Sequence, residues 1–169
     1  MRSTLTLSRD EVFDVLRAVM DPEVPVLSVV ELGIVRDVDV TDERVMVTVT
    51  PTYSGCPAMA AIERDIAAAL RARGAADVEI RTRYSPAWTT DWIPADAREK
   101  LRAYGIAPPG VADHDAPIAI GRRRLPRVVR CPYCGSVDTA LRSEFGSTAC
   151  KAIHVCRSCD QPFEEFKAI

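Results

Sequence analysis

The chain has 169 residues, of which 47% are hydrophobic and 27% charged, and its net charge is -2. This composition is typical of a soluble globular protein and excludes a disordered or membrane-spanning chain. No segment approaches the roughly 18 apolar residues that span a bilayer, and the N-terminus lacks the unbroken apolar run of a signal peptide. We therefore expect a cytoplasmic protein without a membrane partner, whose six cysteines are metal ligands or reactive thiols rather than disulfides.

The first predicted helix covers residues 9–20. Ser8 and Glu11 have the spacing of a capping box, which marks a helix start. The apolar residues that follow recur at the spacing of one buried helical stripe, namely Val12, Val15, Leu16 and Val19. Asp21-Pro22 breaks this pattern. The next stretch, 21–33, contains two prolines and then small aliphatic residues, so we expect an irregular loop.

The middle of the chain alternates between strand and helix signals. Two β-branched segments with a period of two are separated by three polar residues, which predicts an antiparallel hairpin. An alanine-rich segment that begins with proline and ends before glycine predicts a helix. The expected elements are strands 34–40 and 44–50, a helix at 57–73, a strand at 77–83 and a helix at 94–105. This order, α-β-β-α-β-α, indicates an α+β protein whose main domain is a small α/β sandwich.

The sequence changes character after residue 104. Residues 105–126 are rich in proline and lack periodicity, which predicts a linker between a domain at 1–104 and a smaller domain at 127–169. The linker carries three consecutive arginines, Arg122 to Arg124. They are either solvated or a docking strip for an acidic partner or an anionic cofactor. Nucleic-acid binding is not expected, because the net charge is slightly negative and no aromatic residues interleave with these arginines.

Four cysteines near the C-terminus form two CxxC pairs, Cys131 with Cys134 and Cys156 with Cys159. Each pair can turn two thiolates toward one point, and two such knuckles at the ends of short β-hairpins complete a tetrahedral S₄ set. The spacing predicts a Cys₄ zinc ribbon whose structural zinc supplies most of the folding free energy of a small module. A redox dithiol and an iron-sulfur cluster are the alternatives. Cys150 or His154 could in principle replace one of the ligands.

A further cysteine, Cys56, lies in the segment TPTYSGCPAM between the second strand and the alanine-rich helix. A helix N-terminus stabilises a thiolate, so Cys56 is a candidate nucleophile or soft-metal ligand, unless it is only a buried cap. The chain has two histidines, which argues against a cysteine hydrolase. Asp21 and Glu23 are the nearest carboxylates in the expected topology, and a thiolate with carboxylates suits transient binding of iron. Alternatively, Asp21 ends the first helix and Glu23 is a solvated loop acid.

Several motifs resemble known families. DPEVPVLSVVELGIVRDV followed by TPTYSGCPAM resembles the iron-sulfur-assembly domain shared by the SufT proteins and the eukaryotic cytosolic iron-sulfur targeting factors. The whole chain, with YSPAWTTDWIPADAREKLRAYGIAPP, CPYCGS and SEFGSTACKAIHVC, resembles the D-subunit family of the phenylacetyl-CoA epoxidase system. On matching positions, the acidic DPE loop falls on Asp21 and Glu23, the strand-end threonine on Thr50 and the reactive cysteine on Cys56. The similar GSTACK segment makes Cys150 a candidate second, exposed thiol site rather than a small buried residue.

The resemblance implies an accessory subunit in aerobic phenylacetate degradation, not an enzyme. In that system a diiron catalytic subunit, supplied by an iron-sulfur reductase, epoxidises the aromatic ring of phenylacetyl-CoA. The expected role is maturation of the iron or iron-sulfur centre of one of these subunits, and the alternative is a stoichiometric scaffold of the complex. The chain agrees with a non-catalytic role, since it has no paired Glu-x-x-His helices for two irons and no GxGxxG turn. The resemblance also suggests a homodimer.

Overall fold

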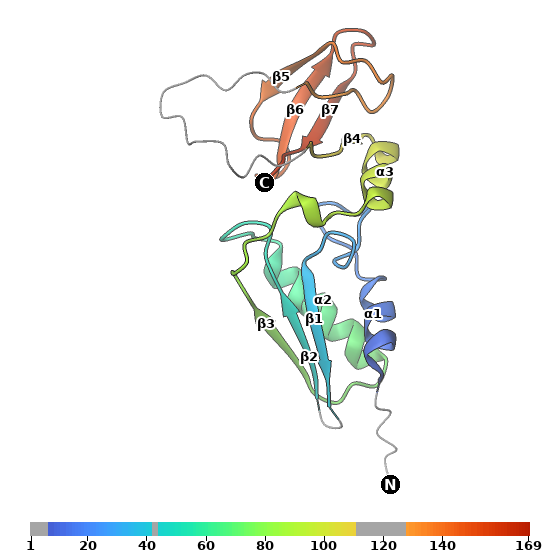
Figure 1. Ribbon diagram of the computed structural model, residues 1–169, viewed down its shortest axis with the longest axis vertical. Helices are drawn as coiled ribbons and strands as arrows, with labels where there is room; N and C mark the ends of the chain where they lie inside the picture. Colours follow the sequence, from blue (N-terminus) through green and yellow to red (C-terminus); the bar gives the residue numbers. More distant parts are fainter. Residues whose placement is uncertain (1–6, 42–43, 111–127) are drawn as a thin grey trace. The chain divides into compact units, whose positions relative to one another are not determined.

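The computed structural model describes residues 7–41, 44–110 and 128–169 (Figure 1). The fold is mixed α+β and divides into two compact units, Met1–Trp88 with Trp92–Ala97 and Thr89–Asp91 with Arg98–Ile169. The predicted order of the first helices and strands, α-β-β-α-β-α, is confirmed. Within the described part of the chain, no helix is long and apolar enough to cross a membrane.

Helix α1, Arg9–Leu16, begins at the predicted capping box. Ser8 Oγ accepts a hydrogen bond from the backbone N–H of Glu11, and Glu11 Oε2 accepts one from the backbone N–H of Ser8. The helix is shorter than predicted, because the chain beyond it pairs with a later segment, where the Val29 N–H donates to the Val19 carbonyl. Val19 is nevertheless buried, so the predicted stripe marks core positions beyond the end of the helix.

The first sheet has the strand order β1-β2-β3. β1 (Val35–Val40) and β2 (Val45–Val49) form the predicted antiparallel hairpin, and β3 (Val78–Thr82) runs parallel to β2. Helix α2 (Met59–Ala72) connects the two parallel strands. Strand valines and one stripe of α2 are buried as the core of this unit, including Val38, Val47, Val49, Ile62, Ile66 and Leu70. The end of β2 and the start of α2 therefore bracket the loop that carries Cys56.

Residues 21–33, the acidic loop, are irregular as predicted but belong to the core. Four apolar side chains of the loop are buried, namely Val24, Leu27, Val29 and Leu32. The Nε1–H of Trp88 donates to the Leu32 carbonyl at 2.9 Å. At the end of the loop Gly33 has a φ of 72°, and an added Cβ would lie 3.0 Å from the Cβ of Trp92. Only glycine fits this turn, and the acidic loop is fixed by packing.

The second sheet has the strand order β4-β7-β6-β5. Within it, β6 pairs antiparallel with both β5 and β7, which forms the short hairpins of the predicted ribbon, whereas β4 runs parallel to β7. The elements that follow β3, in chain order, are the 3₁₀ turn η1 (Thr90–Trp92), α3 (Ala95–Tyr104), β4 (Ile106–Ala107), β5 (Thr139–Ser143), β6 (Lys151–Cys156) and β7 (Pro162–Phe166).

Strand β4 lies inside the segment predicted as a linker, so the structure differs from that prediction at its start. Ile106 and Ala107 are buried and pair with Glu164 and Glu165 of β7. Two residues are too few to show a strand periodicity, and their partners are far away in sequence. Residues 111–126, which include the three arginines, lie outside the described part of the chain. The domain boundaries at 104 and 126 stay predictions.

Candidate functional site

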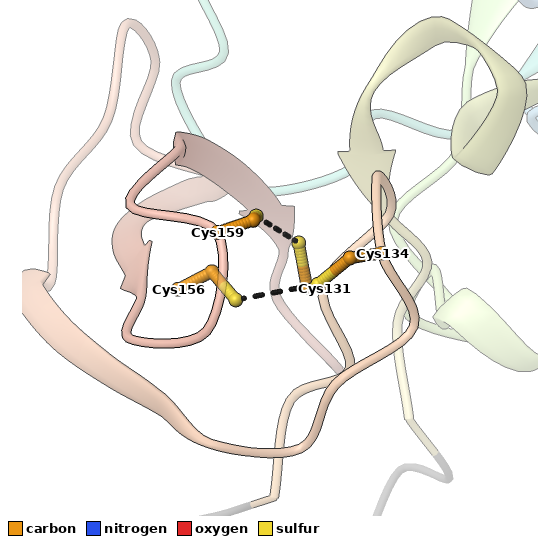
Figure 2. Close-up of side chains that lie close together, drawn as sticks. All are labelled: Cys131, Cys134, Cys156 and Cys159. Atoms are coloured by element: carbon orange, nitrogen blue, oxygen red, sulfur yellow. Dashed lines mark hydrogen bonds between the residues drawn. The ribbon is translucent and has the colours of Figure 1, made fainter.

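The four cysteines of the two CxxC pairs converge on one point (Figure 2). Cys131 and Cys134 lie in a turn before β5, Cys156 ends β6 and Cys159 lies in the turn before β7. Their sulfurs all lie within 4.8 Å of one another, with Sγ–Sγ distances of 3.8 Å for Cys131–Cys159 and 3.5 Å for Cys134–Cys156. In a tetrahedral site with metal–sulfur bonds of about 2.3 Å, the sulfurs are about 3.8 Å apart. The donor set and its spacing fit a closed S₄ metal site.

Tight turns of the backbone orient the four sulfurs toward one another. In the first turn the Gly135 N–H donates to the Cys131 carbonyl, and Gly135 has a φ of 76°, the left-handed conformation that glycine adopts readily. The hydroxyl oxygens of Ser136 and Ser158 are 2.7 Å apart and join the first turn to the second. The buried cluster that contains Cys131 and Cys156 also contains Ala107, Val129 and Phe163. The turns and this small core position the site.

As free thiols, Cys156 and Cys159 have pKa values shifted in opposite directions. Burial raises the pKa of Cys156. The backbone N–H groups of Cys159 and Ser158 and the neighbouring thiols together lower it by more, so that the pKa is about 7. The backbone N–H of Gln161 lowers the pKa of Cys159, but burial and the three other thiols raise it more, to about 12. A bound metal cation deprotonates coordinating thiols outright. Metal binding at this cluster is therefore linked to proton release.

The two residues that could have replaced a cysteine ligand are engaged elsewhere. His154 Nε2 lies 2.9 Å from Glu165 Oε2, and both side chains are buried. The sulfur of Cys150 lies 3.0 Å from Thr148 Oγ1, and Cys150 is 4% exposed. Neither joins the sulfur cluster. The expectation of an exposed thiol at Cys150 is wrong, because the segment folds its sulfur inward.

Cys56 lies two residues before Ala58, the N-terminal cap of α2. Its side chain is partly exposed. The Cys56 N–H donates to the Tyr53 carbonyl, and its carbonyl accepts from the Met59 N–H, which makes a tight turn that leads into the helix. Among the described residues, no side chain forms a capping hydrogen bond at this helix start. The sulfur therefore does not act as the cap of α2.

Thr50, directly after β2, and Asp21, at the start of the acidic loop, are both buried. The Thr50 hydroxyl has no hydrogen-bond partner within residues 7–41, 44–110 and 128–169, although Thr50 is only 2% exposed. Such a group is costly to bury and calls for an explanation, such as a bound ligand or a water. Asp21 is 5% exposed, and its Oδ1 accepts from the N–H groups of Glu23 and Val24 at 2.8 and 2.7 Å. The Asp21 carboxylate thus closes the first turn of the acidic loop.

These residues do not converge as the ribbon cysteines do. In the part of the chain that the structure describes, the ribbon cysteines are the one group of three or more candidate ligands that lie together. Cys56, Asp21 and Glu23 are not assembled into such a group. Their common role, with Thr50, stays a prediction.

Three polar pairs were not foreseen from the sequence. Ser28 and Glu31 form a second capping box inside the acidic loop, and their S-x-x-E spacing was the signal that could have revealed it. Lys151 pairs with Glu164 at 2.9 Å, and His154 pairs with Glu165, across β6 and β7. No motif marks these two pairs, because they depend on the register of the strands.

Comparison with known proteins covers both units. Residues 9–82 match the family described as iron-sulfur cluster assembly protein, and residues 116–167 match the PaaD zinc beta ribbon domain. A protein of Escherichia coli (strain K12), named as the putative D-subunit of 1,2-phenylacetyl-CoA epoxidase, is 48% identical over 159 residues, which are 94% of this chain and 92% of that protein. The chain belongs to the PaaD family of phenylacetyl-CoA epoxidase subunits. The resemblance drawn from the sequence motifs is confirmed.

The first unit of this PaaD family member also occurs in shorter proteins. A protein of Porphyromonas gingivalis (strain ATCC BAA-308 / W83) named "Fe-S protein maturation auxiliary factor" is 33% identical over 103 residues, which are 60% of this chain and 97% of that protein. A domain of unknown function, DUF59, from Bacillus anthracis has a TM-score of 0.52 and 27% identity over 55% of this chain and 90% of its own. A conserved hypothetical protein from Thermotoga maritima has a TM-score of 0.50 and 32% identity over 57% of this chain and 95% of its own. The ribbon is thus an addition to a domain that makes up nearly all of these relatives.

Proposed function

We propose that this PaaD family member is a non-catalytic accessory subunit that matures the iron or iron-sulfur centre of a client in a phenylacetyl-CoA epoxidase system. The client is another subunit of that system, either the diiron catalytic subunit or the iron-sulfur reductase. The observation that carries the proposal is that the ribbon thiols and the Cys56 thiol lie in different places. Four converge in the ribbon, while Cys56 stays partly exposed outside the cluster, in a unit that matches iron-sulfur cluster assembly proteins.

In this proposal the ribbon holds a structural zinc ion on the four cysteines. A zinc site closed by four protein ligands has no open position for a substrate, so its contribution is to folding. The enclosing core is small, and a metal that binds the folded form supplies the stability that such a core lacks. The ribbon then presents a folded surface on which the client docks.

The transfer site is proposed at Cys56, with its thiolate as the transient ligand of the cargo. Thiolates suit soft and borderline metals, and carboxylates from Asp21 and Glu23 would add oxygen ligands or accept protons. The buried Thr50 hydroxyl, without a hydrogen-bond partner in the described residues, supports a ligand near the end of β2. A thiol outside a closed cluster can release what it binds, as a carrier must.

The substitution Cys56→Ser tests this role. We expect the iron content of the client, purified from cells that produce both proteins, to fall to the level reached without this protein, because a serine hydroxyl is a poor ligand for iron at neutral pH. Iron is measured by elemental analysis, together with epoxidase activity. The matched control is Ser54→Ala, which changes an exposed residue of the same loop and keeps the sulfur. Normal iron loading with Cys56→Ser would rule out transfer through this thiol.

A scaffold role is the second candidate, and the word subunit in the name of the Escherichia coli relative favours it. A scaffold remains in the active complex at a fixed ratio, whereas a maturation factor is dispensable once the client is loaded. Removing this protein from a reconstituted, iron-loaded epoxidase separates the two roles. Retained activity supports maturation, and lost activity that returns on adding back Cys56→Ser protein supports the scaffold.

A further inference from the structure

The connection between β5 and β6 is fastened by a carboxylate from β7. Glu164 Oε1 accepts a hydrogen bond from the backbone N–H of Ser147 at 2.7 Å, and Glu164 Oε2 lies 2.9 Å from Lys151 Nζ. The side chains of Lys151 and Glu164 are 5% and 27% exposed, so water reaches this ion pair only in part. We call residues 146–150 the strap.

The strap fits closely against this carboxylate. A Cβ added to Gly146 would lie 2.7 Å from Glu164 Oε1 and 3.1 Å from Lys151 Cβ. The Gly146 N–H donates to the Lys151 carbonyl at 2.7 Å, and the Lys151 N–H donates to the Thr148 carbonyl at 3.1 Å. A side chain at this position would have to displace the carboxylate, which occupies the space that its Cβ would fill.

The strap ends at a buried thiol. Cys150 is 4% exposed, its sulfur lies 3.0 Å from Thr148 Oγ1, and its carbonyl accepts from the Lys167 N–H at 2.9 Å. Cys150 lies outside the small core around the metal-binding cysteines. The strap residues Ser147 and Ala149 are exposed. A buried sulfur thus ends a segment that is partly exposed and that Glu164 contacts through Ser147.

We propose that the strap is a conformational device that masks the Cys150 thiol, with the Glu164 carboxylate as its latch. While Glu164 holds Ser147 and Lys151, soft metals and electrophiles do not reach the sulfur. When the carboxylate is withdrawn, the strap opens and the thiol becomes accessible, which is the condition for thiol reactivity. The inference goes beyond the proposed function, since it concerns the ribbon and does not require Cys56 to carry iron.

The latch is engaged at neutral pH. Burial raises the pKa of Glu164, but the Ser147 N–H and the Lys151 ammonium lower it more, so that it lies below the ordinary value of 4.5. The cross-strand neighbours of Glu164, Ile153 on β6 and Ile106 on β4, carry no charge. A lowered folded-state pKa means that the stabilisation is present above the ordinary value and is lost as the pH falls through the lowered one. Near neutral pH the carboxylate therefore stays ionised, and protonation does not release the strap.

Site-specific alkylation of the full-length, zinc-loaded protein tests the device. The rate at which iodoacetamide modifies Cys150 is followed by peptide mass spectrometry, which distinguishes it from the five other cysteines. We expect Glu164→Gln to raise this rate about tenfold or more, the scale on which charge-assisted hydrogen bonds act. Gly146→Ala should act in the same direction, because its methyl group displaces the carboxylate without removing it. The matched control is Glu144→Gln, which neutralises an exposed carboxylate just before the strap and should leave the rate unchanged.

Zinc content is measured for each variant, so that loss of the fold is not mistaken for opening of the strap. Unchanged Cys150 rates in Glu164→Gln and Gly146→Ala proteins that keep their zinc would overturn the proposal. If those variants lose zinc, amide hydrogen exchange of the unmodified protein tests the proposal instead. The strap predicts that the Ser147 and Lys151 amides exchange through local opening, faster than interior β6 amides such as Val155. Exchange at one common rate would overturn it.

Discussion

Replacing Cys131 with serine should remove the metal and unfold the second unit. Serine does not supply a thiolate, and the three remaining sulfurs do not complete a tetrahedral site. Structural zinc binds small folded modules with apparent free energies of about 10–16 kcal/mol, as large as the whole stability of an ordinary domain, about 5–15 kcal/mol. Zinc per chain is measured by atomic absorption, and the fold by the dispersion of amide NMR signals from residues 128–169.

The matched control for this experiment is Cys150→Ser, which removes a buried sulfur outside the cluster. It should keep one zinc ion per chain and a dispersed spectrum. Chelation of the unmodified protein should reproduce the spectrum of Cys131→Ser. Signals of the first unit should persist in every case, because none of the cluster cysteines lies in that unit. A Cys131→Ser protein that retains its zinc and its dispersed signals would contradict the four-cysteine site.

Features that are encoded by short local sequence patterns could be predicted from the sequence. The capping box at Ser8 and Glu11 is formed as the spacing predicts, and the valine alternation places β1 and β2 in an antiparallel hairpin. The two CxxC pairs likewise bring four sulfurs together. Each of these patterns encodes its own geometry over a few residues, so distant partners do not alter it.

Features that depend on distant partners could not be predicted in this way. α1 ends early because Val19 pairs with Val29, and β4 exists because Ile106 pairs with Glu164 of β7. The pair of His154 and Glu165 requires the register of β6 and β7, since a shift of one residue would move one partner to the opposite face of the sheet. Buried pairs of this kind can specify a register, which gives them a structural role that no short motif displays.

The candidate transfer site was predicted partly from local signals and partly from resemblance. Local patterns placed Cys56 close to the start of α2, but the helix begins slightly later, at Met59. From the sequence, Asp21 was predicted to end the first helix and Glu23 to be a solvated loop acid, or both to be metal ligands. In the structure, Asp21 also has a structural role, because its Oδ1 accepts hydrogen bonds from the N–H groups of Glu23 and Val24. This contact holds the backbone of the acidic loop in place, so a substitution at Asp21 would change the loop as well as remove a carboxylate.

Trp88→Ala should therefore be the cleaner way to disturb the acidic loop, because it leaves every candidate ligand in place. Trp88 is 4% exposed, and its Nε1–H donates to the Leu32 carbonyl, 56 residues away in sequence. Alanine would leave a cavity and an unpaired buried carbonyl. We expect the free energy of unfolding of the first unit to fall by about 3–5 kcal/mol, the range for a large aromatic residue truncated in a core. Urea unfolding of the full-length protein, followed by circular dichroism, measures the loss.

Trp88→Phe is the matched control, since it keeps most of the ring volume and removes only the indole donor. Its expected cost is roughly 1–3 kcal/mol, that of leaving one buried acceptor without a partner. A loss below about 1 kcal/mol for Trp88→Ala would contradict the anchoring of the acidic loop by this residue. Iron loading of the client, measured where Trp88→Ala protein is still folded, adds a functional comparison. Reduced loading, with Cys56, Asp21 and Glu23 all present, would mean that the carrier site depends on the shape of the acidic loop, whereas normal loading would confine the site to Cys56 and its turn.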